Sequence, residues 1–160
     1  MTGAGVTGAG SSPLVEDFLS GDGKRVLSAV WTVFRTRDPA VLAPVSQALP
    51  AIEKATADAD LGGAFVSNNA NLVHALDRIK LFAQGRCLCA AYRSHQFYDV
   101  EKEEAQRHVR VVETVPNDRQ WVPDRICECL GCGKRFQVEQ GEYHYPWWKW
   151  TELKAPKTIV

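Results

Sequence analysis

Hydrophobic and polar residues follow two different patterns along the chain, and the change falls near residue 86. Before it, apolar residues recur at helical spacing, with caps and prolines at the ends of the runs. Beyond it, short runs rich in strand-forming residues are separated by polar turns. We therefore predict an α+β fold, with an N-terminal helical half packed on a small antiparallel sheet.

The first half is predicted to be helical over 13–21, 24–36, 39–57 and 71–85, with a loop over 61–71. Ser12 and Asp38 each precede a proline, which is the order of an N-cap and a first helical position. Pro44 and Pro50 are expected to break the third of these ranges into short helices.

The second half is predicted to contain short strands. We place them over 87–92, 108–115, 120–129 and 134–140, with an aromatic final strand over 142–150. Residues 101–107 are expected to form a solvated turn or a short helix. His95 and His108 fall in what is predicted to be a polar hairpin region, and neither is assigned a role.

No glycine- or serine-rich linker separates the halves, so we expect residues 13–85 and 86–152 to pack as one domain. The first residues, 1–12, are mostly Gly, Ala, Thr and Ser, which is typical of a flexible tail. We expect a second tail over 153–160.

Composition narrows the function classes. The chain of 160 residues carries 19 basic and 19 acidic side chains, so it has no long-range field that would gather nucleic acid. It has no apolar run of about 18 residues that would span a membrane. The N-terminus lacks the pattern of a secretory signal, so we expect the cytoplasm, where its five cysteines favour metal binding or chemistry over disulfides.

Two cysteine pairs predict a metal site. Cys129 and Cys132 frame a turn in which Gly131 and Gly133 permit the backbone twist and let amide N–H groups point at sulfur. The second pair is Cys87 and Cys89. If this segment is a strand, both sulfurs face the same side, so the two pairs can form a tetrahedral four-thiolate site.

These residues resemble the zinc-ribbon class over roughly residues 86–140, on the strength of Cys129, Cys132, Gly133 and the upstream pair. The first pair departs from that class because it is Cys-x-Cys rather than Cys-x-x-Cys. The resemblance implies one structural Zn²⁺ held by Cys87, Cys89, Cys129 and Cys132. Four thiolates leave no open coordination position for water, so the expected zinc is structural and not catalytic.

Cys127 is the fifth thiol. If residues 126–129 form a strand, it faces the same way as Cys129. The sequence therefore favours a small buried apolar residue just below the site, and leaves open that Cys127 replaces Cys87 or Cys89 as a ligand. Neither a redox pair beside a βαβ pattern nor a histidine placed to activate Cys127 is visible.

Basic residues flank the four predicted ligands. Arg86, Arg125, Lys134 and Arg135 are interpreted as charge compensation for the anionic thiolate cluster. A small phosphate-contact patch is the alternative interpretation.

Two further stretches are candidate partner contacts. The first is the acidic run of Asp99, Glu101, Glu103 and Glu104, which is either a solvated face or a docking surface for a basic partner. The second is the aromatic run that holds Trp147, Trp148 and Trp150, which is either a packed strand or an exposed binding patch.

We find no nucleophile–base pair, phosphate loop or open metal site in the sequence, so we do not expect an enzyme. The general layout looks like that of small bacterial toxin-immunity proteins. This resemblance implies a protein that binds a cognate toxin domain and blocks it. The alternative is a zinc ribbon associated with nucleic acid or transcription, which the neutral charge balance makes the less favoured hypothesis.

Overall fold

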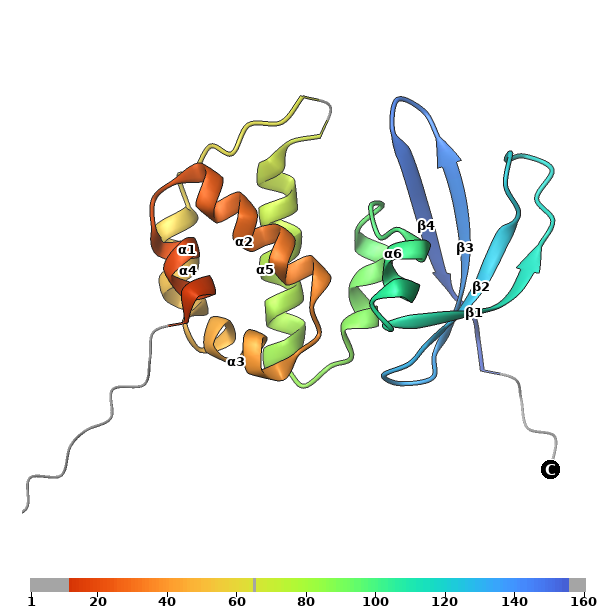
Figure 1. The fold of residues 1–160 in the computed structure, drawn as a ribbon, viewed down its shortest axis with the longest axis horizontal. Coiled ribbons are helices and arrows are strands. Elements are labelled where there is room, and N and C mark those ends of the chain that lie inside the picture. The colour runs from red at the N-terminus through yellow and green to blue at the C-terminus, as the bar shows by residue number, and fades with distance from the viewer. Residues whose placement is uncertain (1–11, 65, 156–160) are drawn as a thin grey trace, which may run out of the picture.

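The computed structural model describes residues 12–64 and 66–155, so the expected tails over 1–12 and 153–160 lie largely outside the described residues. Five helices form the N-terminal half, and a sheet stands at the opposite end of the molecule (Figure 1). The helices are α1 (Pro13–Leu19), α2 (Gly23–Arg35), α3 (Pro39–Gln47), α4 (Leu49–Thr56) and α5 (Asn68–Ala83).

Local capping explains where these helices begin. The side chains of Ser12, Asp22, Asp38 and Ser67 each accept a hydrogen bond from a backbone N–H in the first turn that follows. The break within 39–57 comes at Ala48, and only Pro50 lies at a helix start. Pro44 is accommodated inside α3, so the predicted break at that proline is wrong.

The sheet has four antiparallel strands in the order β1-β2-β3-β4. They are β1 (Val109–Val115), β2 (Asp124–Cys129), β3 (Arg135–Glu142) and β4 (Pro146–Glu152). Together with the helices they give the α+β class that the sequence predicts. The acidic run forms a short helix, α6 (Val100–Ala105), which Asp99 caps.

The strand predicted over 87–92 is wrong, because this segment is a 3₁₀ helix, η1 (Leu88–Ser94). Gly85 ends α5 in the left-handed conformation, and the consecutive alanines 90 and 91 favour helix over strand. The segment nevertheless lies beside the sheet. The N–H of Trp148 donates to the carbonyl of Gln96, just after η1, at 2.8 Å, which covers part of the free edge of β4.

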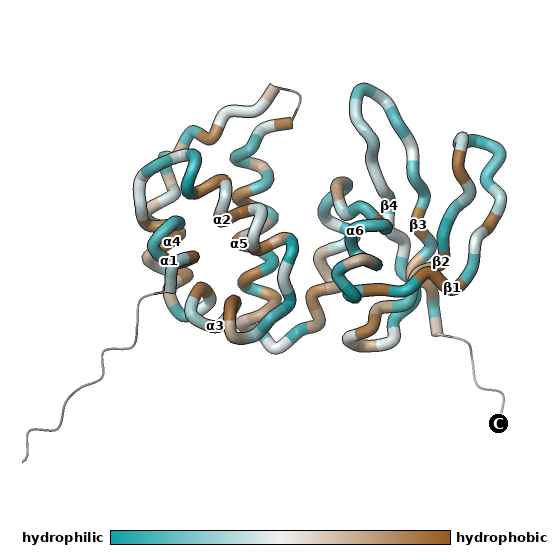
Figure 2. The backbone as a smooth tube through the Cα atoms, in the orientation of Figure 1, coloured by the Kyte–Doolittle hydropathy of each residue, from teal (hydrophilic) through white to brown (hydrophobic). Residues whose placement is uncertain are grey.

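One hydrophobic core runs from the helices into the sheet. Figure 2 shows hydrophobic positions recurring along the helices of the N-terminal half. On the sheet side the ring of Tyr92 stacks on that of Trp150, with the centroids 4.1 Å apart. Among the described residues, no helix is long and apolar enough to cross a bilayer.

Candidate metal centre

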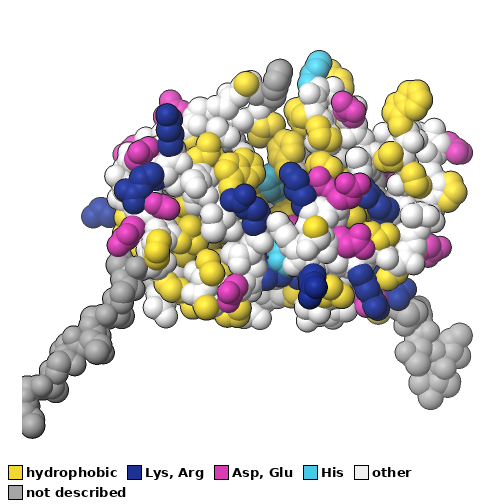
Figure 3. Space-filling model, viewed as in Figure 1, with side chains coloured by type: hydrophobic (Ala, Val, Ile, Leu, Met, Phe, Trp, Pro, Cys, Tyr) yellow, Lys and Arg dark blue, Asp and Glu magenta, His cyan; other side chains and the backbone are white. Residues whose placement is uncertain are grey.

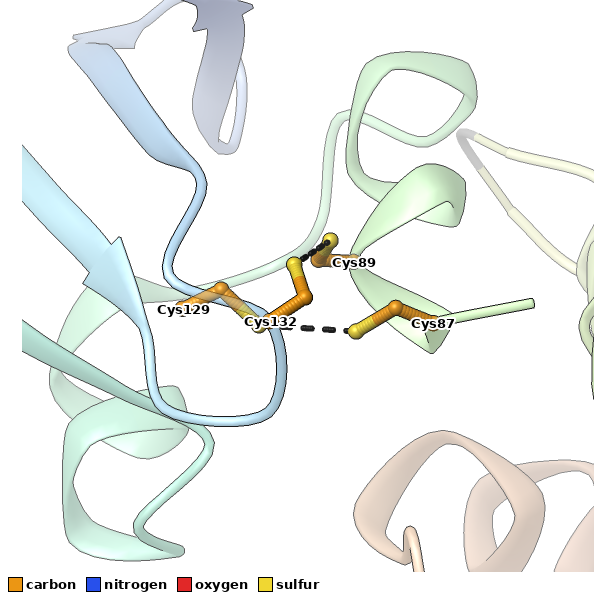
Figure 4. A group of neighbouring side chains, drawn as sticks. All are labelled: Cys87, Cys89, Cys129 and Cys132. Carbon is orange, nitrogen blue, oxygen red and sulfur yellow. Dashed lines mark hydrogen bonds between the residues drawn. The ribbon is translucent and has the colours of Figure 1, made fainter. Parts of the chain in front are cut away.

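The four cysteines predicted as ligands meet between η1 and the turn that joins β2 to β3 (Figure 4). Cys129 is the last residue of β2, and Cys132 lies in the turn. Cys87 is the N-cap residue of η1, and Cys89 lies in its first turn. The start of a 3₁₀ helix therefore brings the sulfurs of Cys87 and Cys89 to one point, where a strand was expected to do so.

The sulfur positions fit a tetrahedral metal site. All four Sγ atoms lie within 4.8 Å of one another. The Sγ of Cys87 is 3.6 Å from that of Cys129, and the Sγ of Cys89 is 3.5 Å from that of Cys132. With Zn–S bonds of about 2.3 Å, a regular tetrahedron has S–S edges of about 3.8 Å. All five cysteines are free thiols, so the four sulfurs of the cluster are available as ligands.

The turn between the strands is shaped for this site. Gly133 has a φ of 78°, and its N–H donates to the carbonyl of Cys129 at 2.8 Å. A Cβ at Gly131 would lie 3.3 Å from the Sγ of Cys87 and 3.4 Å from the Nη1 of Arg37. The glycine at 131 thus lets the turn approach the sulfurs closely.

Hydrogen bonds favour the thiolate at one ligand. A hydrogen bond from the thiol of Cys89, together with one from Arg37, holds the pKa of Cys129 well below its usual range. The backbone of Cys132 also donates to Cys129. The pKa of Cys89 is raised in turn, by its bond to Cys129 and by burial. The thiolate is the form that binds metal, so these hydrogen bonds favour the metal-binding form of Cys129.

Arg37 is the site residue that sequence analysis missed. It follows α2 in the helical half, and its Nη1 donates to the Sγ of Cys129 at 3.2 Å. Its Nη2 donates to the hydroxyl of Tyr92 at 2.6 Å. Four thiolates around one divalent ion carry a net charge of about −2, which the guanidinium partly balances. The only sequence signal is an arginine just past a helix end, which gives no hint of this contact.

A buried polar network continues from Arg37. The hydroxyl of Tyr92 donates to the Oε2 of Glu103 at 2.5 Å, and the Nδ1 of His108 lies 3.0 Å from the same oxygen. The carbonyl of His108 accepts from the N–H of Leu130 at 3.0 Å, inside the cysteine turn. The network therefore contacts the cysteine turn through the backbone of His108. The side chain of His108 is buried, so its expected place in a polar hairpin region is wrong.

Arg78 fixes the segment that carries Arg37. It is fully buried in α5, and its Nε and Nη2 donate to the carbonyls of Val33 and Thr36, each at 3.0 Å. Its Nη1 donates to the hydroxyl of Tyr98 at 3.3 Å. A cation at the C-terminal end of α2 also complements the helix dipole. Arg78 thus caps α2 immediately before Arg37.

Cys127 lies outside the cluster. Its side chain is wholly buried in the hydrophobic core, as the sequence interpretation favoured. Burial raises the pKa of its thiol to about 12. A thiol with so high a pKa is a poor nucleophile and behaves as a small apolar residue.

The flanking cations mostly pair with carboxylates rather than with the sulfurs. Lys134 lies 3.3 Å from Glu152, Arg135 lies 3.2 Å from Glu128, and Arg125 lies 3.8 Å from Glu101. Figure 3 shows basic side chains interspersed with acidic ones over the visible face of the molecule. The cation that contacts the cluster is Arg37, which lies far away in sequence.

The candidate partner contacts divide into buried and exposed residues. Glu103, Trp148 and Trp150 are buried, and Trp147 is half-buried against Gly141. Glu101 and Glu104 are exposed and Asp99 is half-buried, so they remain at the surface. Sequence analysis missed Trp121, the most exposed aromatic residue in the described part of the chain, whose side chain projects fully into solvent from the loop between β1 and β2.

The chain matches no protein-family model, no curated protein and no solved structure. Neither the zinc-ribbon resemblance nor the toxin-immunity resemblance therefore has support beyond the residues themselves. The metal site is therefore inferred from the geometry of the cysteine cluster itself.

Proposed function

We propose that the protein binds one structural Zn²⁺ through Cys87, Cys89, Cys129 and Cys132, and that it acts by binding another protein. The spacing of the four sulfurs carries the proposal. Four thiolates are a donor set that zinc prefers for structural sites. When bound, the ion would join η1 to the β2–β3 turn, and Arg37 would tie that junction to the helical half.

The donor set favours a structural role over a catalytic one. A four-thiolate shell is closed, whereas catalytic zinc keeps a position for water or substrate. The arrangement also requires a reducing compartment, because neighbouring thiols would otherwise oxidise to disulfides. On this proposal the metal stabilises the fold, and the protein acts through the surface of that fold.

Metal analysis tests the first part. Protein purified without chelator should contain about one zinc per chain, and a chelator should unfold the sheet half. Tetrahedral four-sulfur sites also suit iron. A coloured, iron-containing protein, or a folded protein with all five thiols freely titratable and no metal, would refute the zinc assignment.

The partner we propose is a toxin domain that the protein blocks by stoichiometric binding. Its support is the layout of the chain and a rigid, charge-mixed surface with exposed Glu101, Glu104 and Trp121. Exposed carboxylates and an exposed aromatic side chain suit a basic, partly apolar protein surface.

Co-expression with the products of neighbouring genes tests the partner. A 1:1 complex by sedimentation, with loss of the neighbour's toxicity in cells, is the expected result. A polarisation titration with DNA and RNA at low salt tests the nucleic-acid hypothesis. Clear affinity for either would replace protein binding with the nucleic-acid hypothesis.

A further inference from the structure

A cleft lies between the two halves, outside the metal centre. It has a volume of about 880 Å³ and is lined by residues of α5, of β4 and of the segment at the end of η1. A second hollow of about 340 Å³ shares His74, Arg93 and His95 with it and continues between α5 and η1. Figure 3 also shows the molecule hollowed between the helical half and the sheet.

The charges along this cleft are unbalanced. The residues that line the two hollows include Arg86, Arg93 and Lys149, and none of these cations has an ion-pair partner within 4 Å among the described residues. Arg93 lines both hollows, whereas Lys149 stands at the rim, opposite Glu139 in the sheet register. The two carboxylates of the lining are both paired, Asp77 with Lys80 at 4.0 Å and Glu152 with Lys134 at 3.3 Å. The cleft is therefore locally cationic in a chain that is neutral as a whole.

Apolar surface accompanies these charges. Phe97 and Trp147 line the cleft, and both residues are half-buried. Behind them, the Oδ1 of Asn71 and the Nε1 of Trp148 have no hydrogen-bond partner among the described residues, although both side chains are more than nine-tenths buried. Unpaired buried polar atoms are costly, so a ligand that lets them pair would gain free energy.

From this combination we propose that the cleft binds an acidic segment of a protein partner, with an aromatic side chain of that segment inserted against Phe97 and Trp147. The inference rests on the proposed binding function and adds a second contact surface to that of Glu101, Glu104 and Trp121. Carboxylates of the segment would pair with Arg93 and Lys149 at the rim. Three separated cations suit point contacts with carboxylates, whereas single-stranded nucleic acid favours a continuous basic track.

The test uses fluorescein-labelled peptides and zinc-loaded protein. The probe is acetyl-EEFDWEE-amide, and its charge-inverted counterpart is acetyl-KKFKWKK-amide. Anisotropy should show binding of the acidic peptide in the range of about 10–100 µM and weaker binding of the basic one. In NMR spectra the indole N–H of Trp148 and the side-chain amide of Asn71 should shift on titration.

Two double variants that change the net charge equally distinguish binding in the cleft from a general electrostatic effect. Arg93→Glu/Lys149→Glu should weaken acidic-peptide binding at least about tenfold and favour the basic peptide. Lys24→Glu/Lys54→Glu alters exposed lysines of α2 and α4 outside the cleft lining, and should bind like the wild type. Zinc content and circular dichroism establish that both variants are folded.

Three results would overturn the inference. They are no binding of the acidic peptide up to about 1 mM, an equal loss in both double variants, or preferential binding of oligo(dT) or oligo(U). A neighbouring-gene partner that binds Arg93→Glu/Lys149→Glu with wild-type affinity would also refute the cleft while leaving the proposed function intact. Loss of zinc binding and of all partner binding would instead refute the proposed function.

Discussion

Arg37 and Cys129 lie 92 positions apart in the sequence, and the Nη1 of Arg37 donates a 3.2 Å hydrogen bond to the Sγ of Cys129. The Nη2 of the same guanidinium donates to the hydroxyl of Tyr92, which in turn donates to the carboxylate of Glu103. One side chain from the helical half therefore joins the cysteine cluster to the buried polar network. Its planar fork suits this double role, which a lysine ammonium would fill poorly.

Replacing Arg37 should loosen the metal centre. In Arg37→Gln the cluster loses a charged donor and the Tyr92 hydroxyl loses one of its two hydrogen-bond partners, so we expect a loss of about 2–3 kcal/mol in the free energy of unfolding. Zinc affinity should fall about 10- to 100-fold, as for other residues that support metal ligands. Competition with a chromogenic chelator measures the affinity. Arg35→Gln, at the exposed end of α2, should change neither quantity, and an Arg37→Gln protein with wild-type zinc affinity would contradict the assigned contact.

The five cysteines should separate into four ligands and one core residue. Cys132→Ala removes a sulfur from the cluster, so it should reduce bound zinc well below one per chain and destabilise the sheet half. Cys127→Ala removes a buried sulfur outside the cluster, so it should retain one zinc and lose only about 1–2 kcal/mol of stability. Elemental analysis and the cobalt-substituted visible spectrum measure the difference. Loss of metal from Cys127→Ala with retention in Cys132→Ala would reverse the assignment.

The grouping of the four cysteines could be predicted from sequence because each pair is local. Cys129 and Cys132 are held by a glycine turn, and only one residue separates Cys87 from Cys89. Their convergence needed only that the two segments meet. The wrong secondary structure at Cys87 did not affect this result, since the start of a 3₁₀ helix and a strand can both direct two nearby sulfurs to one point.

The supporting residues could not be predicted, because they act across long sequence separations. Glu103 belongs to an acidic run that reads as a solvated face, yet Tyr92 and His108 enclose its carboxylate. Arg78 reads as a polar position on an amphipathic helix, yet it is fully buried because the end of α2 offers it two carbonyls. Hydropathy patterns place charged residues outside, and these two are inside because tertiary partners satisfy them.

Arg78 should prove essential to stability despite lying outside the cluster. In Arg78→Met the carbonyls of Val33 and Thr36 lose their donors in a buried setting, so we expect a loss of about 3 kcal/mol. Zinc release should also quicken, because the segment that carries Arg37 is no longer fixed. Lys80→Met, two positions later, removes surface ion pairs with Glu53 and Asp77 and should cost under about 1 kcal/mol. Urea unfolding compares the two, and equal losses would contradict the capping role.

His95 should make the protein sensitive to mild acid. Its ring is buried among Phe34, Phe97 and Tyr98 and stacks on His74, with the centroids 4.6 Å apart. Burial, assisted by the charge of His74, lowers the pKa of His95 to about 4 in the folded protein. An unfolded chain has a histidine pKa of about 6.5. Between these values the unfolded state binds a proton that the folded state does not, so stability falls as the pH falls.

The wild type should therefore lose about 2 kcal/mol between pH 7 and pH 5 through His95 alone. His95→Gln removes this titration while keeping the cysteine ligands. The difference in unfolding free energy between the two proteins then reports His95 separately from any protonation of thiolates. We expect His95→Gln to be less stable than the wild type at pH 7 and to narrow that gap by about 2 kcal/mol at pH 5. A gap that stays constant with pH, measured by urea unfolding with zinc content checked at each point, would show that His95 is not held neutral by the fold.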